Sequence, residues 1–287
     1  MAMSFNAAAH GPGHVHSSRE RAALAEAVDV QETGIPVEAA DSDRAWGVSL
    51  TTGWESRHVH YGVDESGPSG TYFNEIGVRI GDFSVNVWNG FGLGNELVEW
   101  DFTAGYNIEV GPVFLVPGYN LRYVPSQNES GHAHGEEHGH EEHGHEEHGH
   151  EEHGEEEGGH IHNTYGNELF LVLGTTAIPY VTPSAVFIWD LNNNPGGFLE
   201  FRLDGEVPVY KDVISLQPYA LLGLNFGYNT TEVYGLNNFQ FGLQGTVAIN
   251  KYVSAFAGIN YSVALEALNA IDQDNVVWVN VGLSFAY

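Results

Sequence analysis

The chain has 287 residues, 38 Asp and Glu against nine Lys and Arg, a formal net charge of -29 with neutral histidines, and no cysteine. The missing cysteines exclude disulfide frameworks, thiolate metal sites and cysteine nucleophiles, and the acidic excess opposes binding to a phosphate backbone, so no nucleic-acid partner is expected. Only 16% of the residues are charged, against about a quarter in an ordinary soluble domain, yet glycine and aromatic residues are abundant.

Residues 1–44 predict a leader or linker without a fold of its own. The stretch is polar and alanine-rich, with a short helix that Ser17 or Ser18 would open. Ala7-Ala8-Ala9 before a polar run resembles a small-residue export cleavage site, which suggests a truncated or misassigned start; a plain tail is the alternative. No run in the whole chain approaches the ~20 apolar residues of a membrane helix.

The rest of the chain, apart from one tract, alternates apolar and polar residues with the period of a β-strand. Between Val98 and Ile108, for example, large apolar residues fall on one face while Glu99, Asp101 and Thr103 fall on the other. We expect twelve strands in one domain over residues 45–287: 45–56, 71–81, 82–89, 97–109, 112–124, 166–175, 180–190, 197–207, 214–228, 238–249, 252–263 and 275–287.

The composition of the two strand faces predicts an all-β, closed antiparallel transmembrane β-barrel. A soluble sandwich would expose a face rich in Lys and Glu, but only Lys211 and Lys251 occur, both in expected turns, and the polar face is mostly Gly, Ser, Thr and Asn. Outer-membrane barrels place the apolar face against lipid and the polar face in the lumen. We therefore predict a location in the bacterial outer membrane, with its lipid as a partner.

The connections agree with this prediction, because they alternate between long and tight, as the extracellular loops and periplasmic turns of such barrels do. Ser56 to Gly70, Asn229 to Asn237 and Ala264 to Asp274 are long, whereas Gly81-Asp82 and Asn250-Lys251 are tight. This order makes residues 126–163 the third extracellular loop.

That third loop contains a low-complexity tract, because 11 His, 12 Glu and 8 Gly fill 31 of the 34 positions from 129 to 162. Such a segment has little apolar surface to bury and is expected to be disordered. Imidazole and carboxylate both bind Zn, Ni and Cu, so we predict several exchangeable divalent-metal sites and no tightly bound cofactor. The candidate ligands are His132, His134, His138, His140, His143, His145, His148, His150, His153, His160 and His162.

Other interpretations of the tract stay open. It could be a solvated acidic loop that repels anions, or a repeat tolerated because surface loops accept insertions at small cost. It could also sense protons, because protonation of all the histidines near pH 5 to 6 would nearly cancel its charge.

The polar strand faces supply candidates for the lumen and its selectivity. They are Glu75, Arg79, Glu99, Asp101, Arg122, Glu168, Glu200, Arg202, Asp204 and Glu206. A twelve-stranded bore is narrower than that of the 16-stranded porins, so we expect these charges to pair across it and, being mainly acidic, to favour cations or small neutral solutes. The alternative is a structural charge network in a plugged barrel.

Two parts of the chain resemble known families. The terminal run Val279, Val281, Leu283, Phe285, Tyr287 resembles the C-terminal strand by which outer-membrane proteins are recognised, which implies the barrel assembly machinery as a partner. Residues 53–62 (GWESRHVHYG) resemble TorF-type porins, and so does the later run from Thr182-Pro183-Ser184 through Trp189-Asp190 to Gly197-Phe198-Leu199-Glu200. This resemblance implies passive diffusion. Tyr61 departs from that pattern, since an arginine is usual before the glycine, and the His/Glu tract is absent from it.

A smaller histidine pair lies near the end of the first expected strand. His58 and His60 are spaced to share one strand face and could join the tract in metal binding, or be interfacial residues without a ligand role. Ser56, Asp64 and Glu65 nearby would supply partners for an enzyme, but no catalytic spacing is present, and we expect no enzyme.

Together these features predict a porin-like channel whose third loop captures divalent metal. The alternative is a non-conducting barrel that anchors a metal-binding or pH-sensing loop. Whether the chain forms oligomers stays open.

Overall fold

The computed structural model describes residues 46–94, 97–125, 164–192, 195–211 and 213–287. The predicted leader and the His/Glu tract with its candidate metal ligands therefore lie outside the described residues.

The described residues are almost entirely β-strand, as the alternation predicts. The strands are β1 (Trp46–Glu55), β2 (Val59–His60), β3 (Val63–Asp64), β4 (Thr71–Ile80), β5 (Phe83–Gly92), β6 (Val98–Tyr106), β7 (Ile108–Val110), β8 (Val113–Val124), β9 (Thr164–Thr175), β10 (Val181–Asp190), β11 (Gly196–Gly205), β12 (Val207–Tyr210), β13 (Ile214–Phe226), β14 (Gly235–Ala248), β15 (Val253–Ala264) and β16 (Val276–Ala286). The helical elements are short: the 3-10 turn η1 (Gly67–Ser69) and α2 (Glu266–Asn269). No helix in the described ranges is long and apolar enough to cross a membrane.

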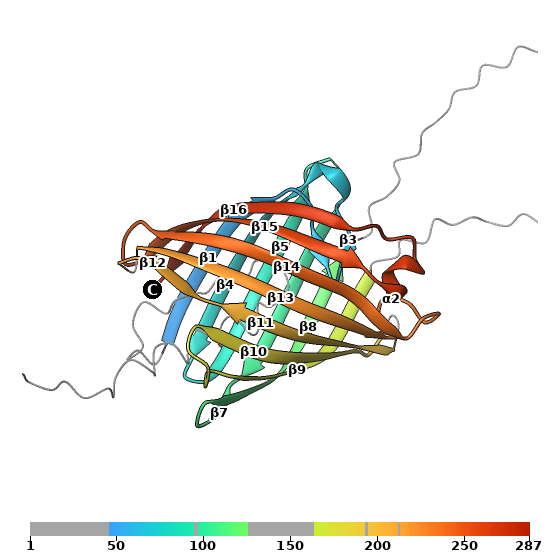
Figure 1. Ribbon diagram of the computed structural model, residues 1–287, viewed down its shortest axis with the longest axis horizontal. Helices are drawn as coiled ribbons and strands as arrows, with labels where there is room; N and C mark the ends of the chain where they lie inside the picture. Colours follow the sequence, from blue (N-terminus) through green and yellow to red (C-terminus); the bar gives the residue numbers. More distant parts are fainter. Residues whose placement is uncertain (1–45, 95–96, 126–163, 193–194, 212) are drawn as a thin grey trace, which may run out of the picture.

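The wall is a closed 12-strand antiparallel barrel, which confirms the predicted fold class (Figure 1). Each wall strand pairs with its neighbours in the sequence, β11 pairs with β13, and β1 pairs with β16 from Ser49↔Ala286 to Glu55↔Asn280. β7 extends β6, and β12 extends β11 after a one-residue interruption. Closure leaves no long unpaired edge among the described strands, and a wall within hydrocarbon requires paired edges.

The outer surface of the wall is apolar. Side chains such as Ile76, Leu171 and Val277 face outward and are roughly half exposed, whereas their neighbours along each strand face the interior. A belt of exposed apolar side chains around a closed wall is suited to contact with the lipid of a bilayer. In water, a protein with such a surface would aggregate.

The interior is less uniformly polar than the sequence suggested. Besides Asn, Ser, Thr and charged residues, it contains an apolar band from β8 to β11. Its buried members are Phe114, Val116, Val172, Val186, Ile188 and Phe198. Period-two alternation assigns a residue to a face, but apolar residues on both faces of a strand leave open which face meets lipid.

The two ends of the barrel differ, as Figure 1 shows. The end that carries the C-terminus has tight turns, for example at Gly81 and Gly111, where φ is +59° and +63°. We call the opposite end, with the longer connections and α2, the mouth.

The barrel mouth as a candidate functional site

The first long connection, residues 56–70, folds into the mouth; we call it loop 1. Its centre is the β2–β3 hairpin, in which His60 pairs with Val63. Tyr61 and Gly62 form the two-residue turn with φ values of 48° and 84°, the backbone of a tight hairpin. His58, His60 and Tyr61 are all at most 8% exposed, so this loop is an internal part of the barrel.

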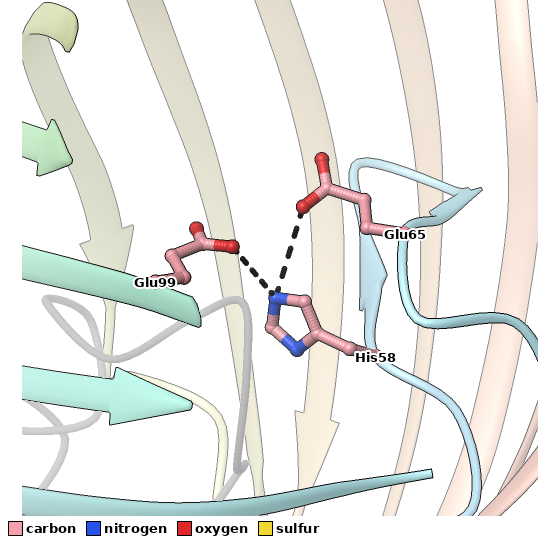
Figure 2. Close-up of side chains that lie close together, drawn as sticks. All are labelled: His58, Glu65 and Glu99. Carbon is pink, nitrogen blue, oxygen red and sulfur yellow. Dashed lines mark ion pairs between the residues drawn. The ribbon is translucent and has the colours of Figure 1, made fainter. Parts of the chain in front are cut away.

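His58 ties loop 1 to β1 through Glu55 and to β6 through Glu99, and Figure 2 shows its approach to Glu99 and Glu65. Its Nδ1 lies 2.8 Å from Glu55 Oε1 at the end of β1, and its Nε2 lies 3.6 Å from Glu99 Oε2 on β6 and 4.0 Å from Glu65 Oε2. The ring also stacks on Trp88, with centroids 4.9 Å apart. Three carboxylates and an indole thus fix the position of one buried imidazole.

Arg122 on β8 is the basic partner of this cluster. Its guanidinium forms an ion pair with Glu99, with Nε 2.5 Å from Oε1. It donates hydrogen bonds through Nη2 to Glu99 Oε2 at 3.0 Å, through Nη1 to His60 Nδ1 at 2.6 Å, and to Glu65. Burial raises the pKa of the Glu65 carboxyl, but the attraction of Arg122 and of the nearby His60 outweighs it, and the pKa lies below its ordinary value. Glu65 is therefore ionised at neutral pH.

The opposite side of loop 1 packs on the apolar band. The centroid of the Tyr61 ring lies 4.7 Å from the ring centroids of both Phe198 and Tyr228. The backbone carbonyl of Tyr61 accepts hydrogen bonds from the side-chain amides of Asn229 at 3.1 Å and Asn237 at 2.8 Å. Burial is the main cause that raises the pKa of the Tyr61 phenol well above its ordinary value. Loop 1 is thus held from two opposite sides of the mouth: by β1, β6 and β8 on one side, and by the apolar band with Asn229 and Asn237 on the other.

The last long connection covers loop 1. Gln273 Oε1 accepts a hydrogen bond from the backbone N–H of Asp64 at 3.1 Å, and Leu268 of α2 is fully buried. A Cβ added to Gly62 would lie 2.8 Å from Leu268 Cδ1. Glycine is required here both by the positive φ and by this close approach.

Most of the predicted lumen residues lie on inward-facing positions. Those that are buried or partly buried there are Glu75, Arg79, Glu99, Asp101, Arg122, Glu168, Glu200, Arg202 and Asp204. Glu206, in contrast, is exposed in the gap between β11 and β12. Arg202 bonds Asp204 at 2.7 Å on its own strand and lies 4.6 Å above the Tyr219 ring, whereas Arg122 pairs with Glu99 on the adjacent strand and with Glu65 of loop 1.

The sequence prediction missed several residues of the mouth. Glu55 and Asp190 face inward, and alternation along their strands could have identified both. Alternation could not identify Glu65 and Tyr61 as residues of the mouth, because a loop has no regular apolar-polar pattern. Nothing in its sequence pattern therefore shows that it folds into the barrel. His58 and His60 lie beyond β1, which ends at Glu55, and only His60 belongs to a strand, the short β2, but their rings stack with centroids 6.4 Å apart.

The closed wall and its apolar outer belt make the chain a bacterial outer-membrane β-barrel. No family model and no curated protein matches the chain. The solved KdgM porin matches with a TM-score of 0.51 at 8% identity, covering 83% of this chain and 99% of that chain. A second structure, the KdgM porin in complex with disordered oligogalacturonate, gives a TM-score of 0.49 at 7% identity, covering 84% of this chain and 99% of that chain. The NanC porin gives 0.48 at 9% identity, covering 83% and 98%. The match to the KdgM porin with a TM-score of 0.51 supports the fold of this chain and nothing beyond the fold.

Proposed function

We propose that the chain is a porin-like channel for passive diffusion of small solutes or cations, with the His/Glu tract capturing divalent metal at its extracellular side. The observation that carries this proposal is the charge of the interior. Among the residues that the structure describes, acidic side chains on inward-facing positions of the wall outnumber the basic ones. The acidic set is Glu55, Glu75, Glu99, Asp101, Glu168, Asp190, Glu200 and Asp204, and the basic set is Arg79, Arg122 and Arg202.

An acidic pathway favours cations because a narrow, low-dielectric bore strengthens the field of its wall charges. Neutral solutes that fit would pass unhindered by this charge. The TorF-type resemblance and the porin-like fold are consistent with passive transport. The tract, with its own acidic charge, would raise the cation concentration at the mouth.

Planar-bilayer recording tests the channel. With a KCl gradient across the bilayer, we expect single-channel steps and a reversal potential displaced toward that of K⁺. The matched measurement replaces Glu168 by Gln, which should shift the reversal potential toward zero. Steps with anion preference would contradict the acidic-lumen argument.

A second candidate is favoured by loop 1, which occupies the mouth and is held from both walls. In this alternative, the barrel does not conduct and serves as an anchor for the tract. Folded protein that inserts into bilayers without single-channel steps would favour the anchor over the channel.

Metal capture by the tract is tested separately by calorimetry. Full-length protein is titrated with Zn²⁺ beside a variant in which the eleven tract histidines are replaced by Asn, called the tract-Asn variant below. We expect the native chain to bind several equivalents of Zn²⁺ and the variant to lose most of them. Equal binding by the two proteins would overturn metal capture by the tract.

A further inference from the structure

A second cluster of metal-ligand type lies inside the mouth, within the described residues. His58, Glu65 and Glu99 each offer one ligand atom, and these atoms lie within 4.8 Å of one another (Figure 2). They come from loop 1 and from β6, so the cluster exists only when loop 1 is seated.

The imidazole is oriented as a metal ligand would be. With Nδ1 donating to Glu55 at 2.8 Å, the lone pair of a neutral ring is on Nε2, which faces Glu99 and Glu65. Histidine ligands usually give their other ring N–H to a carboxylate or carbonyl, which fixes the tautomer. Glu55 is therefore placed as the positioning residue of the site, and Trp88 restrains the ring face.

The charge of the cluster also favours a cation. Glu55, Glu65 and Glu99 carry three negative charges against the single guanidinium of Arg122, and burial makes an uncompensated charge costly. A bound divalent ion would balance the remaining two charges without protons on the histidines.

We propose that His58, Glu65 and Glu99 bind one divalent ion of the zinc type in the barrel mouth. Zinc bonds to nitrogen and oxygen are about 2.0–2.2 Å long, so tetrahedral ligand atoms lie roughly 3.4 Å apart. The separations from His58 Nε2 are 3.6 and 4.0 Å, and no pair of ligand atoms is more than 4.8 Å apart, so the ligands must draw together by at most about 1.4 Å. The site is distinct from the tract, and it requires neither conduction nor metal capture by the tract.

Arg122 sets the strength of binding. Its Nη2 donates to the same oxygen of Glu99, at 3.0 Å, that faces His58, and it also pairs with Glu65. The guanidinium and the ion would share these carboxylates and repel each other. We therefore expect an exchangeable ion and weaker binding than in a closed structural zinc site.

The test uses the full-length tract-Asn variant, in detergent, titrated with Zn²⁺ by calorimetry and with Co²⁺ by visible absorption. One saturable equivalent is expected, with Co²⁺ bands that Zn²⁺ abolishes. His58→Asn and Glu99→Gln should each abolish both signals, and Glu55→Gln should weaken binding by about 10–100-fold.

His60→Asn is the matched control. His60 is a buried neighbour that bonds Arg122 and lies 3.7 Å from Glu65 Oε1, the oxygen that does not face His58. It offers no ligand atom to the ion, so this variant should retain the equivalent. Heat-dependent gel mobility verifies that each variant is folded. The proposal is overturned if folded tract-Asn protein binds no ion, if binding survives His58→Asn, or if His60→Asn loses it equally. Because binding is measured at equilibrium in detergent, a non-conducting barrel would leave the result interpretable.

Discussion

At the residue scale, Arg122 is the charge on which the seating of loop 1 depends. It pairs with Glu99, which is fully buried, and with Glu65. Removing one partner of a buried ion pair typically costs about 3–5 kcal/mol, because the other charge stays buried. We therefore expect Arg122→Gln to lower the free energy of unfolding by about 3 kcal/mol, measured by urea titration in lipid vesicles.

Arg57 supplies the matched control. It pairs with Asp64 in the same loop, but although the Asp64 side chain is 7% exposed, that of Arg57 is 35% exposed, against 16% for Arg122. A pair whose cation is partly solvated contributes less than a buried one. Arg57→Gln should therefore change the unfolding free energy little. Equal losses in the two variants would contradict the assigned role of Arg122.

The lowered pKa of Glu65 makes loop 1 sensitive to acid. A carboxylate whose folded pKa is depressed contributes stability above its ordinary pKa of about 4.5, and the contribution is lost as the pH falls through the lower folded pKa. We expect amide hydrogen exchange in residues 56–70, corrected for the intrinsic pH dependence, to accelerate below about pH 4.5. In Glu65→Gln this acceleration of exchange at low pH should be smaller. An unchanged acceleration would show that another carboxyl group, such as that of Glu99, is responsible for it.

At the element scale, the strands were predictable and loop 1 was not. Each wall strand carries its own period-two signal, so β8, expected at 112–124, is found at Val113–Val124. The inward fold of loop 1 depends on contacts with β6, β8 and α2, which are distant in sequence. Its only local signal is the Tyr61-Gly62 turn. The lumen charges were foreseen by alternation, whereas their grouping around His58 required the closed barrel.

Gly62 tests whether loop 1 is locked by its packing. Gly62 and Gly67 both have positive φ, but a Cβ at Gly67 meets nothing within 4 Å, whereas at Gly62 it would clash with Leu268 and Asn238. Both alanine substitutions carry backbone strain of about 1–2 kcal/mol, and only Gly62→Ala adds the clash. We expect faster proteinase K cleavage within loop 1 for Gly62→Ala than for Gly67→Ala; equal rates would show that the last long connection does not hold the loop.

At the scale of the whole molecule, the outward apolar belt defines the membrane contact. Val87 and Asn86 are neighbours at mid-height on β5, Val87 on the outer face and Asn86 on the inner face. A lysine facing lipid near the bilayer midplane costs about 2–4 kcal/mol, and a lysine facing the lumen is tolerated better. Val87→Lys should therefore lower the unfolding free energy in vesicles more than Asn86→Lys does. The reverse order would contradict the orientation of the wall.

The junction of β8 and β9 gives the molecule a modular attachment point. Val124 is the register partner of Thr164, and the rings of Tyr123 and Tyr165 stack 4.9 Å apart. The intervening 39 residues thus join two positions that the wall already holds together, and closing a longer loop costs only slightly more entropy. Tract length can therefore vary between related chains, or be redesigned as a display site for foreign peptides, without altering strand register.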